Sequence, residues 1–284
     1  MPGPRSLSLL KMRGLKYNEW MKKINTLLLL ILISCSHKST GPFTETHGCF
    51  LLFNLKTKKY ENKTGTLCEE RFPASSTFKI PLALMALDSG VLKDEHQIIN
   101  WDGEKGMLDA WNKDQNAFTW MKESVVWVSK VIYPKLGAAR VHDYLKQFNY
   151  GNQDISSGNA PWLNSITDER GALKINAYEQ VEFLTRLWTN QLNISLRAME
   201  ITRNITYLET SPNGFRLSGK TGSNKFNDER TLHLGWFVAH VSNGDKEYIA
   251  VTNIADIKET DPKDFGGYRA KDLTKNMLKK FNLW

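Results

Sequence analysis

The chain has 284 residues, of which 41% are hydrophobic and 11% aromatic. This content is enough to bury a core and excludes an intrinsically disordered protein. The formal net charge is +8, but residues 1–34 hold six Lys or Arg against one acid. Because no later Lys/Arg cluster is interleaved with aromatic residues, we exclude nucleic acid as a partner.

Residues 1–34 are predicted to be an export leader. The positively charged Met21-Lys22-Lys23 precedes an apolar run over 27–33, which is too short to span a bilayer comfortably. The twenty residues before Met21 lack any such pattern, so Met21 is the alternative start of the protein. The remainder, 35–284, is predicted to be a single catalytic domain.

The end of the leader has two interpretations. Leu32-Ile33-Ser34-Cys35 resembles a bacterial lipobox, in which the cysteine becomes the lipidated first residue. The alternative is an ordinary signal peptide that is cleaved near 36–38. Both predict export to the periplasm, and only the first predicts a membrane contact, through the lipid on Cys35.

Two further cysteines, Cys49 and Cys68, form an even pair once Cys35 is lipidated or removed. They flank 50–67, whose pattern predicts a β-hairpin with the string Lys63-Thr64-Gly65 in its turn. Paired strands can hold two cysteines within disulfide range, and an oxidising periplasm permits the bond. The alternative is that both are small buried apolar residues.

The next elements are mostly helical. A helix is predicted over Thr77–Asp88, ended by Gly90. Further helical patterns cover 110–121, 126–135, 138–148, 177–189 and 196–201. Four tryptophans in or beside this region, Trp101, Trp111, Trp120 and Trp188, are assigned to the core.

The period then changes to that of antiparallel strands, over 215–221, 234–241 and 248–254, and an amphipathic helix over 269–281 ends the chain. We therefore predict an α+β fold, in which N- and C-terminal helices cover an antiparallel sheet. An all-helical subdomain, about 95–200, is inserted between the strands. The cleft between sheet and subdomain is the expected site.

Ser76 and Lys79 form an S-x-x-K pair at the start of the first predicted helix. At a spacing of three, both side chains share one helix face, so the amine can reach the hydroxyl. A serine hydroxyl is a poor nucleophile until a base takes its proton. The helix N-terminus also turns backbone N–H groups toward a developing oxyanion. Alone the signal is weak, because Ser8 and Lys11 in the leader have the same spacing.

The order of four motifs along the chain makes the signal specific. They are Ser76-Thr77-Phe78-Lys79, Ser124-Val125-Val126, Tyr150-Gly151-Asn152 and Lys220-Thr221-Gly222. In this order they resemble the serine β-lactamase and penicillin-binding superfamily, and together they are similar to class D, the oxacillin-hydrolysing β-lactamases. The resemblance covers the chain from about Gly48 to Leu278.

The resemblance implies an enzyme of antibiotic resistance whose partners are β-lactam antibiotics, with oxacillin- and cloxacillin-type penicillins as substrates. Ser76 would form the acyl-enzyme, and Lys79 would be carbamylated to N6-carboxylysine and act as general base. Burial disfavours a charged lysine, so a free amine becomes available to add CO2. Apart from CO2 or bicarbonate no cofactor is expected. Val126 keeps the pocket apolar, and Trp162 would donate its indole N–H to the carbamate.

Other roles also follow from the resemblance. Ser124 would pass a proton to the β-lactam nitrogen, and Lys220 would supply positive charge beside Ser124 and the substrate carboxylate. Thr221, Gly222 and Ser223 would bind substrate along the strand, and the backbone N–H groups of Ser76 and Ser223 would form the oxyanion hole. Arg269 would bind the substrate carboxylate; the alternative is a solvated arginine at a helix start.

Several other interpretations compete with these. Tyr150-Gly151-Asn152 can equally be a helix end with a glycine cap. The six histidines lack the spacing of a zinc site, so no metal is expected. A β-lactam sensor domain, which stays acylated, and a cell-wall transpeptidase share the same Ser/Lys plan. The oligomeric state is left open.

Overall fold

The computed structural model describes residues 47–158, 160–163, 172–225, 233–256 and 265–284. The predicted leader and Cys35 lie outside these residues. Within the described part, no helix is both long and apolar enough to cross a membrane.

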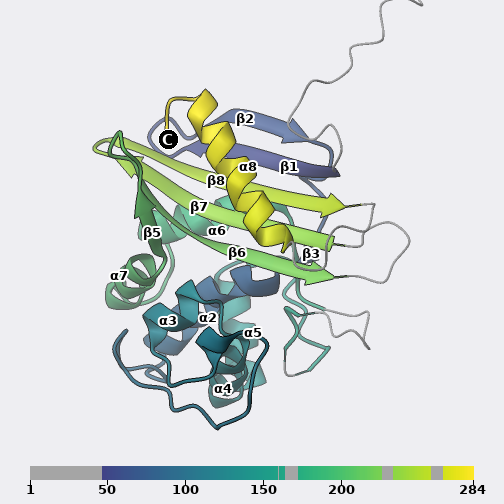
Figure 1. Ribbon diagram of the computed structural model, residues 1–284, viewed down its shortest axis with the longest axis vertical. Helices are drawn as coiled ribbons and strands as arrows, with labels where there is room; N and C mark the ends of the chain where they lie inside the picture. The colour runs from purple at the N-terminus through teal and green to yellow at the C-terminus, as the bar shows by residue number, and fades with distance from the viewer. Residues whose placement is uncertain (1–46, 159, 164–171, 226–232, 257–264) are drawn as a thin grey trace, which may run out of the picture. The chain divides into compact units, whose positions relative to one another are not determined.

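Six strands form one antiparallel sheet in the order β2–β1–β8–β7–β6–β5 (Figure 1). Their bounds are β1 His47–Asn54, β2 Lys59–Gly65, β5 Tyr207–Thr210, β6 Arg216–Lys225, β7 His233–Asn243 and β8 Lys246–Asp256. The N-terminal hairpin joins the C-terminal strands through β1 and β8, with Phe50 opposite Thr252. The sheet is therefore built from both ends of the described chain, as predicted.

Helices cover both faces of this sheet. α8, Gly266–Lys280, crosses one face over β6, β7 and β8 (Figure 1), and α6, Ala177–Trp188, packs against β1, β7 and β8. Strand residues alternate between two apolar clusters, so that Phe237 belongs to the cluster with α8 and Val238 to the cluster with α6. The predicted α+β fold is confirmed.

The remaining helices form the all-helical part around α2, Lys79–Asp88. Every α2 residue except Asp88 is buried, and α2 packs against α4 and α7. The other helices are α3 Ala117–Lys122, α4 Val126–Leu136, α5 Ala138–Gln147 and α7 Leu196–Ile205. Short pieces complete the fold: β3 Phe72–Pro73 paired with β4 Lys174–Ile175, and the 3₁₀ helices η1 Ser75–Phe78 and η2 Asp109–Trp111.

The predicted helix over 110–121 is wrong, because the chain leaves the helical path between η2 and α3. Gln115 instead pairs with Ile99 in an isolated β-bridge. Asn116 is the N-cap of α3. Its side chain accepts from the Thr119 N–H, and the Thr119 side chain accepts from the Asn116 N–H, which together form a capping box. An Asn side chain that bonds to the backbone of the next turn favours the N-cap position over the interior of a helix.

Three boundaries also differ from the sequence-based prediction. Lys63-Thr64-Gly65 lies on β2 and not in the hairpin turn. The predicted last helix begins three residues earlier, at Gly266, and α7 continues to Ile205. The edge strand β5, four residues long, was not predicted because so short a run carries little periodicity.

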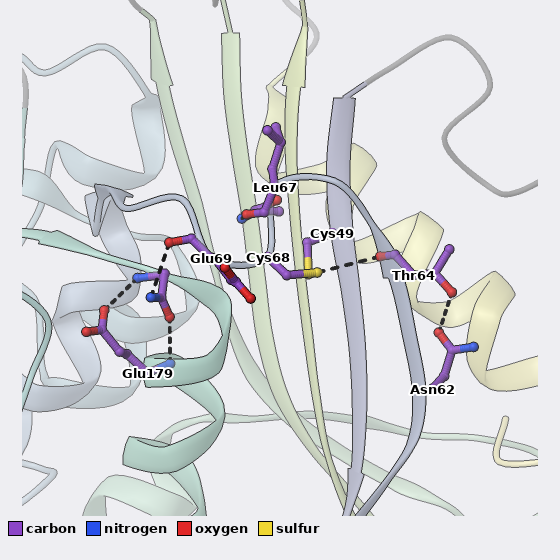
Figure 2. Close-up of a disulfide and its surroundings, with 9 residues drawn as sticks. Cys49, Asn62, Thr64, Leu67, Cys68, Glu69 and Glu179 are labelled. Atoms are coloured by element: carbon purple, nitrogen blue, oxygen red, sulfur yellow. Dashed lines mark hydrogen bonds between the residues drawn. A yellow bond between two sulfur atoms is a disulfide. The ribbon is translucent and has the colours of Figure 1, made fainter.

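The predicted disulfide between Cys49 and Cys68 is present, with the two Cα atoms 5.0 Å apart (Figure 2). The residues on either side of Cys68 are also held by hydrogen bonds. The Asn253 side-chain amide donates to the Leu67 carbonyl at 3.3 Å, and the Asn176 amide donates to the Glu69 carbonyl at 3.4 Å. The disulfide and these contacts hold the segment that leads to η1 against the sheet.

Candidate active site

Ser76 lies on η1, the single turn between the sheet and α2. From Phe72 to Leu87, Ser76 is the one residue that is not buried. The turn is held from several sides: the Trp162 carbonyl accepts from the Ser75 N–H at 2.9 Å, and Gln180 Nε2 donates to Thr77 Oγ1 at 3.0 Å. A rigid turn thus presents one accessible hydroxyl.

The strand β6 passes close to η1 at Gly222. A Cβ atom on Gly222 would lie 3.2 Å from the Ser75 Cβ and 3.2 Å from the Thr77 Cγ2. Such distances are tighter than ordinary van der Waals contact, so a larger residue would push β6 away from η1. Glycine at this position brings Thr221 and Ser223 beside Ser76, and all three line one cavity.

The Lys79 Nζ lies 3.5 Å from the Ser76 Oγ, at the long limit of a hydrogen bond. The Lys79 side chain is buried, with 1% of the residue exposed. Burial, and then the charge of nearby Lys220, lower the pKa of Lys79 well below its ordinary value. This arrangement favours the neutral form of the amine next to the hydroxyl.

Lys220, on β6, is also buried, and its Nζ donates to the Thr221 carbonyl at 3.0 Å and to Thr221 Oγ1 at 3.3 Å. Burial lowers the pKa of Lys220 to about 7. The structure therefore brings the two predicted lysines together, although they are far apart in the sequence. At neutral pH the pair carries less positive charge than two exposed lysines would.

A cavity of about 160 Å³ opens above Ser76. Among the described residues, four serine and threonine side chains line it: Ser76, Ser124, Thr221 and Ser223. Its apolar and aromatic lining consists of Met107, Leu108, Trp111, Val126, Leu163, Phe265 and Tyr268. The remaining lining residue is Glu123. The site therefore combines a hydroxyl-bearing floor with apolar walls, as expected for a small-molecule pocket.

Ser124 has a backbone φ of +56°, in the left-handed region that non-glycine residues seldom adopt. The next residue donates its N–H to the Trp120 carbonyl at 3.1 Å, and α4 begins at Val126. Strained backbone of this kind persists where the surrounding contacts enforce it, and such positions cluster at active sites. The turn places Ser124 on the cavity wall.

Trp162 and Arg269 do not line the cavity among the described residues. Trp162 is buried and stacks on Phe78, with ring centroids 4.8 Å apart. Phe78 directly precedes Lys79 in the chain. Arg269 is half-buried in the first turn of α8. That turn is joined to the site by the Gly267 N–H, which donates to Ser223 Oγ at 2.9 Å.

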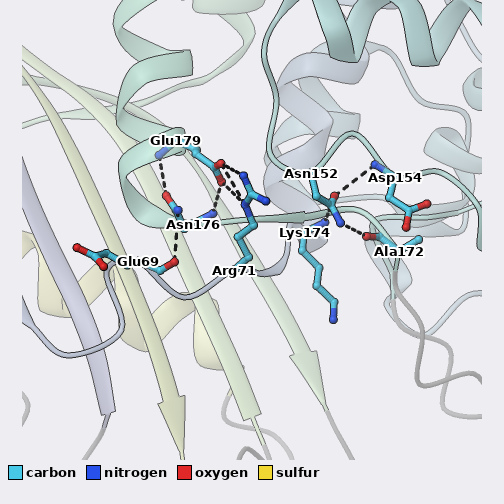
Figure 3. Close-up of polar contacts among 8 residues, drawn as sticks. All are labelled: Glu69, Arg71, Asn152, Asp154, Ala172, Lys174, Asn176 and Glu179. Atoms are coloured by element: carbon cyan, nitrogen blue, oxygen red, sulfur yellow. Dashed lines mark hydrogen bonds and ion pairs between the residues drawn. The ribbon is translucent and has the colours of Figure 1, made fainter.

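Tyr150-Gly151-Asn152 lies behind the site. The buried Tyr150 ring meets the Phe78 ring edge-on at 5.8 Å. Asn152 binds the segment around β4: its Nδ2 donates to the Ala172 carbonyl at 2.7 Å and its Oδ1 accepts from the Lys174 N–H at 2.9 Å (Figure 3). These contacts support the walls and give the motif a structural role.

Sequence reasoning missed part of the cavity lining. Trp111, assigned to the core, lines the cavity, as do Met107 and Leu108 in the loop before it. Nothing in their local pattern marks them, because a loop residue has no periodicity. Glu123 was also missed, although its position next to Ser124 was a usable signal.

Comparison with known proteins agrees with this geometry. Residues 47–279 match the family model described as penicillin binding protein transpeptidase domain. The chain is 34% identical over 244 residues to beta-lactamase OXA-1 of Escherichia coli, covering 81% of this chain and 87% of that protein. It is 32% identical over 237 residues to the regulatory protein BlaR1 of Bacillus licheniformis, covering 84% of this chain but 37% of that protein.

Solved structures give the same result. The class D beta-lactamase BAT-2 superposes with a TM-score of 0.75 at 31% identity, covering 86% of this chain and 94% of that one. The class D beta-lactamase FUS-1 of Fusobacterium nucleatum has a TM-score of 0.75 at 32% identity, covering 84% and 93%.

Proposed function

The chain belongs to the class D serine β-lactamases, and on this premise we propose that it hydrolyses oxacillin- and cloxacillin-type penicillins through an acyl-enzyme on Ser76, and so confers resistance to these antibiotics. One observation carries the proposal. The buried amine of Lys79 lies 3.5 Å from the only hydroxyl of η1 that borders the cavity. A nucleophile with a base in reach is the minimum that acyl transfer requires.

In the proposed acylation, the Ser76 oxygen attacks the β-lactam carbonyl carbon and gives its proton to the base at Lys79. The ring C–N bond breaks, and Ser124 donates its proton to the departing nitrogen and takes up the proton held by the base at Lys79, which leaves the base free again. The Ser76 and Ser223 backbone N–H groups stabilise the oxyanion. Lys220 and Arg269 bind the substrate carboxylate. In deacylation the same base takes a proton from water, which attacks the ester carbonyl carbon; the bond from that carbon to the Ser76 oxygen then breaks, and the base returns its proton to this oxygen.

We propose that the base is a carbamate of Lys79, formed from dissolved CO2. Two features support this assignment: burial lowers the pKa of Lys79, which favours the free amine that adds CO2, and Val126 makes the neighbouring wall apolar. When formed, the group supplies an anionic oxygen as general base. Trp162, fixed by its stacking on Phe78, would donate its indole N–H to this anion.

The similarity to BlaR1 favours a second candidate, a sensor that is acylated at the same serine and does not deacylate. Steady-state hydrolysis separates the two. An enzyme turns over oxacillin and a chromogenic cephalosporin many times per active site. A single stoichiometric burst, with the acyl group retained on the protein, would overturn the proposed hydrolase and support the sensor.

We further propose that the protein is exported to the periplasm and anchored by lipid on Cys35. The support is the charged and apolar pattern of 1–34, followed by the lipobox-like Leu32-Ile33-Ser34-Cys35. Fractionation of expressing cells tests this. Cys35→Ser should move the protein from the membrane to the periplasmic extract, whereas wild type already wholly in that extract would contradict the anchor and leave plain secretion.

A further inference from the structure

Among the residues that the structure describes, twelve line the cavity, and Glu123 is the only Asp, Glu, Lys or Arg of these twelve. The others are hydroxyl-bearing, aliphatic or aromatic. Such a charge distinguishes bound substrates by their own charge, because it attracts a cationic substituent and repels an anionic one.

Glu123 is held firmly in position. It caps the C-terminus of α3, and its N–H donates to the Thr119 carbonyl at 2.9 Å. Its own carbonyl accepts from Trp111 Nε1 at 2.9 Å, and the Trp111 carbonyl accepts from Trp127 Nε1 at 2.9 Å. These bonds join Glu123 to the wall that carries Trp111, so the residue and this aromatic ring belong to the same side of the cavity.

The Glu123 carboxylate is also uncompensated. Within the described residues no Lys, Arg or His lies in ion-pair distance of it, and no donor bonds to it. The residue is half-buried, so solvent reaches part of it. Glu123 and Trp111 line the same cavity, and a carboxylate and an indole both favour a cation, the first through Coulomb attraction and the second through cation–π contact with the ring.

We propose that Glu123, together with Trp111, makes the enzyme select β-lactams that carry a positively charged substituent. This inference rests on the proposed β-lactam hydrolysis and deepens it. All these substrates share one carboxylate, which is proposed to bind Lys220 and Arg269. The charge of Glu123 therefore acts on the substituents by which one β-lactam differs from another. An ammonium on the acyl side chain or a cationic ring opposite it has the required chemistry, whereas an added carboxylate is repelled.

Two matched sets of substrates test the inference. Benzylpenicillin, ampicillin and carbenicillin share a phenylacetyl side chain and differ by an added ammonium or carboxylate. Cephalothin and cephaloridine share their acyl group, and the latter has a cationic pyridinium on the other substituent. The measured quantity is the ratio of kcat/KM for the charged substrate to that for its neutral partner, in wild type and in Glu123→Gln. Glu104→Gln is the control, because Glu104 is exposed and lies outside the cavity lining.

We expect Glu123→Gln to lower the cation-to-neutral ratio about two- to fivefold in at least one set and to raise the carbenicillin ratio. A changed ratio in the penicillin set shows that Glu123 acts on the acyl side chain, and a changed ratio in the cephalosporin set shows that it acts on the substituent opposite. Raising the ionic strength should lower the wild-type ratio toward that of the variant, while Glu104→Gln keeps the wild-type ratio. Ratios that are the same in wild type and Glu123→Gln, with all rates changing in parallel, would overturn the inference and leave the hydrolase intact.

The proposed function can fail separately. If wild type acylates but does not turn over, the hydrolase is overturned, and the same ratios are then measured as acylation rates by intact-protein mass spectrometry. A cation preference that Glu123→Gln removes would still support the role of Glu123, and equal acylation ratios in both proteins would overturn it.

Discussion

The amine of Lys79 lies 3.5 Å from the hydroxyl of Ser76, and these neighbours have opposite exposure: the serine borders the cavity and the lysine is buried beneath it. The lysine proposed as general base is placed there at a cost in stability, because burial disfavours its charged form. The proposed catalytic role of Lys79 and its cost in stability can be tested separately.

Ser76→Ala should lower β-lactam turnover by about 10³-fold or more, because the variant lacks the oxygen that forms the acyl-enzyme. The serine is half-buried on a turn held by other residues, so the thermal unfolding midpoint should change little. Mass spectrometry with a slow substrate should place the acyl adduct on the Ser76 peptide. Ser89→Ala, at the other end of α2, is the control and should keep full activity. An adduct on another peptide contradicts the assignment.

Replacing Lys79 by methionine should stabilise the protein at neutral pH. The folded-state pKa of Lys79 is lowered from 10.5, so between the lowered pKa and 10.5 the unfolded chain binds a proton that the folded protein does not. Wild-type stability therefore rises with pH through this window, by about 1.4 kcal/mol per pH unit for this group. The methionine variant lacks this dependence, and its advantage should shrink as the pH approaches 10.5.

Urea unfolding in CO2-free buffer measures this difference, and Lys130→Met, at an exposed position of α4, is the matched control. The variant should also lose turnover, which separates the catalytic use of the lysine from its cost in stability. Equal stabilities of wild type and Lys79→Met at neutral pH would show that burial of this amine carries no penalty.

Bicarbonate should raise the activity of enzyme depleted of CO2, because the proposed base is a carbamate of neutral Lys79. Activity should fall at acid pH, where the amine is protonated and the carbamate decomposes. Trp162→Phe should weaken the carbamate by about 1.5–3 kcal/mol, through the loss of a buried hydrogen bond to an anion. The measurement is the bicarbonate concentration at half-maximal activity, which should rise in the variant. An activity that ignores bicarbonate at every pH assigns the base to another group.

Loss of the Cys49–Cys68 disulfide should lower the free energy of unfolding by about 3 kcal/mol, since the bond closes a loop with a sequence separation of 19. The double variant Cys49→Ala/Cys68→Ala should keep its kcat, because neither cysteine lines the cavity. Urea unfolding with and without dithiothreitol supplies an internal control: the reductant should destabilise wild type and leave the double variant unchanged. An insensitive wild type would mean that the cysteines are not bonded in solution.

Much of the fold could be predicted from the sequence because it rests on local patterns. The apolar run of β7 follows from a strand that is buried on both faces of the sheet, and the helical period of α5 and α6 follows from the face that each helix buries. The predictions failed where local signals compete. Between η2 and α3 a capping asparagine ends what the apolar spacing alone had suggested was one helix.

The sequence by itself determined the order of the motifs and hence the family, but it contains two copies of K-T-G that look alike. Motif order favours Lys220-Thr221-Gly222, and the tertiary structure shows the physical difference between the two copies. Lys63-Thr64-Gly65 lies on β2, at the edge of the sheet, whereas Lys220-Thr221-Gly222 lies on β6, where Gly222 lets the strand approach η1. The burial that lowers the pKa of Lys79 and Lys220, and the placing of Glu123 and Trp111 on one cavity wall, depend on chain segments far apart in sequence. Solvent exclusion is a property of the packed molecule, so no local pattern reports it.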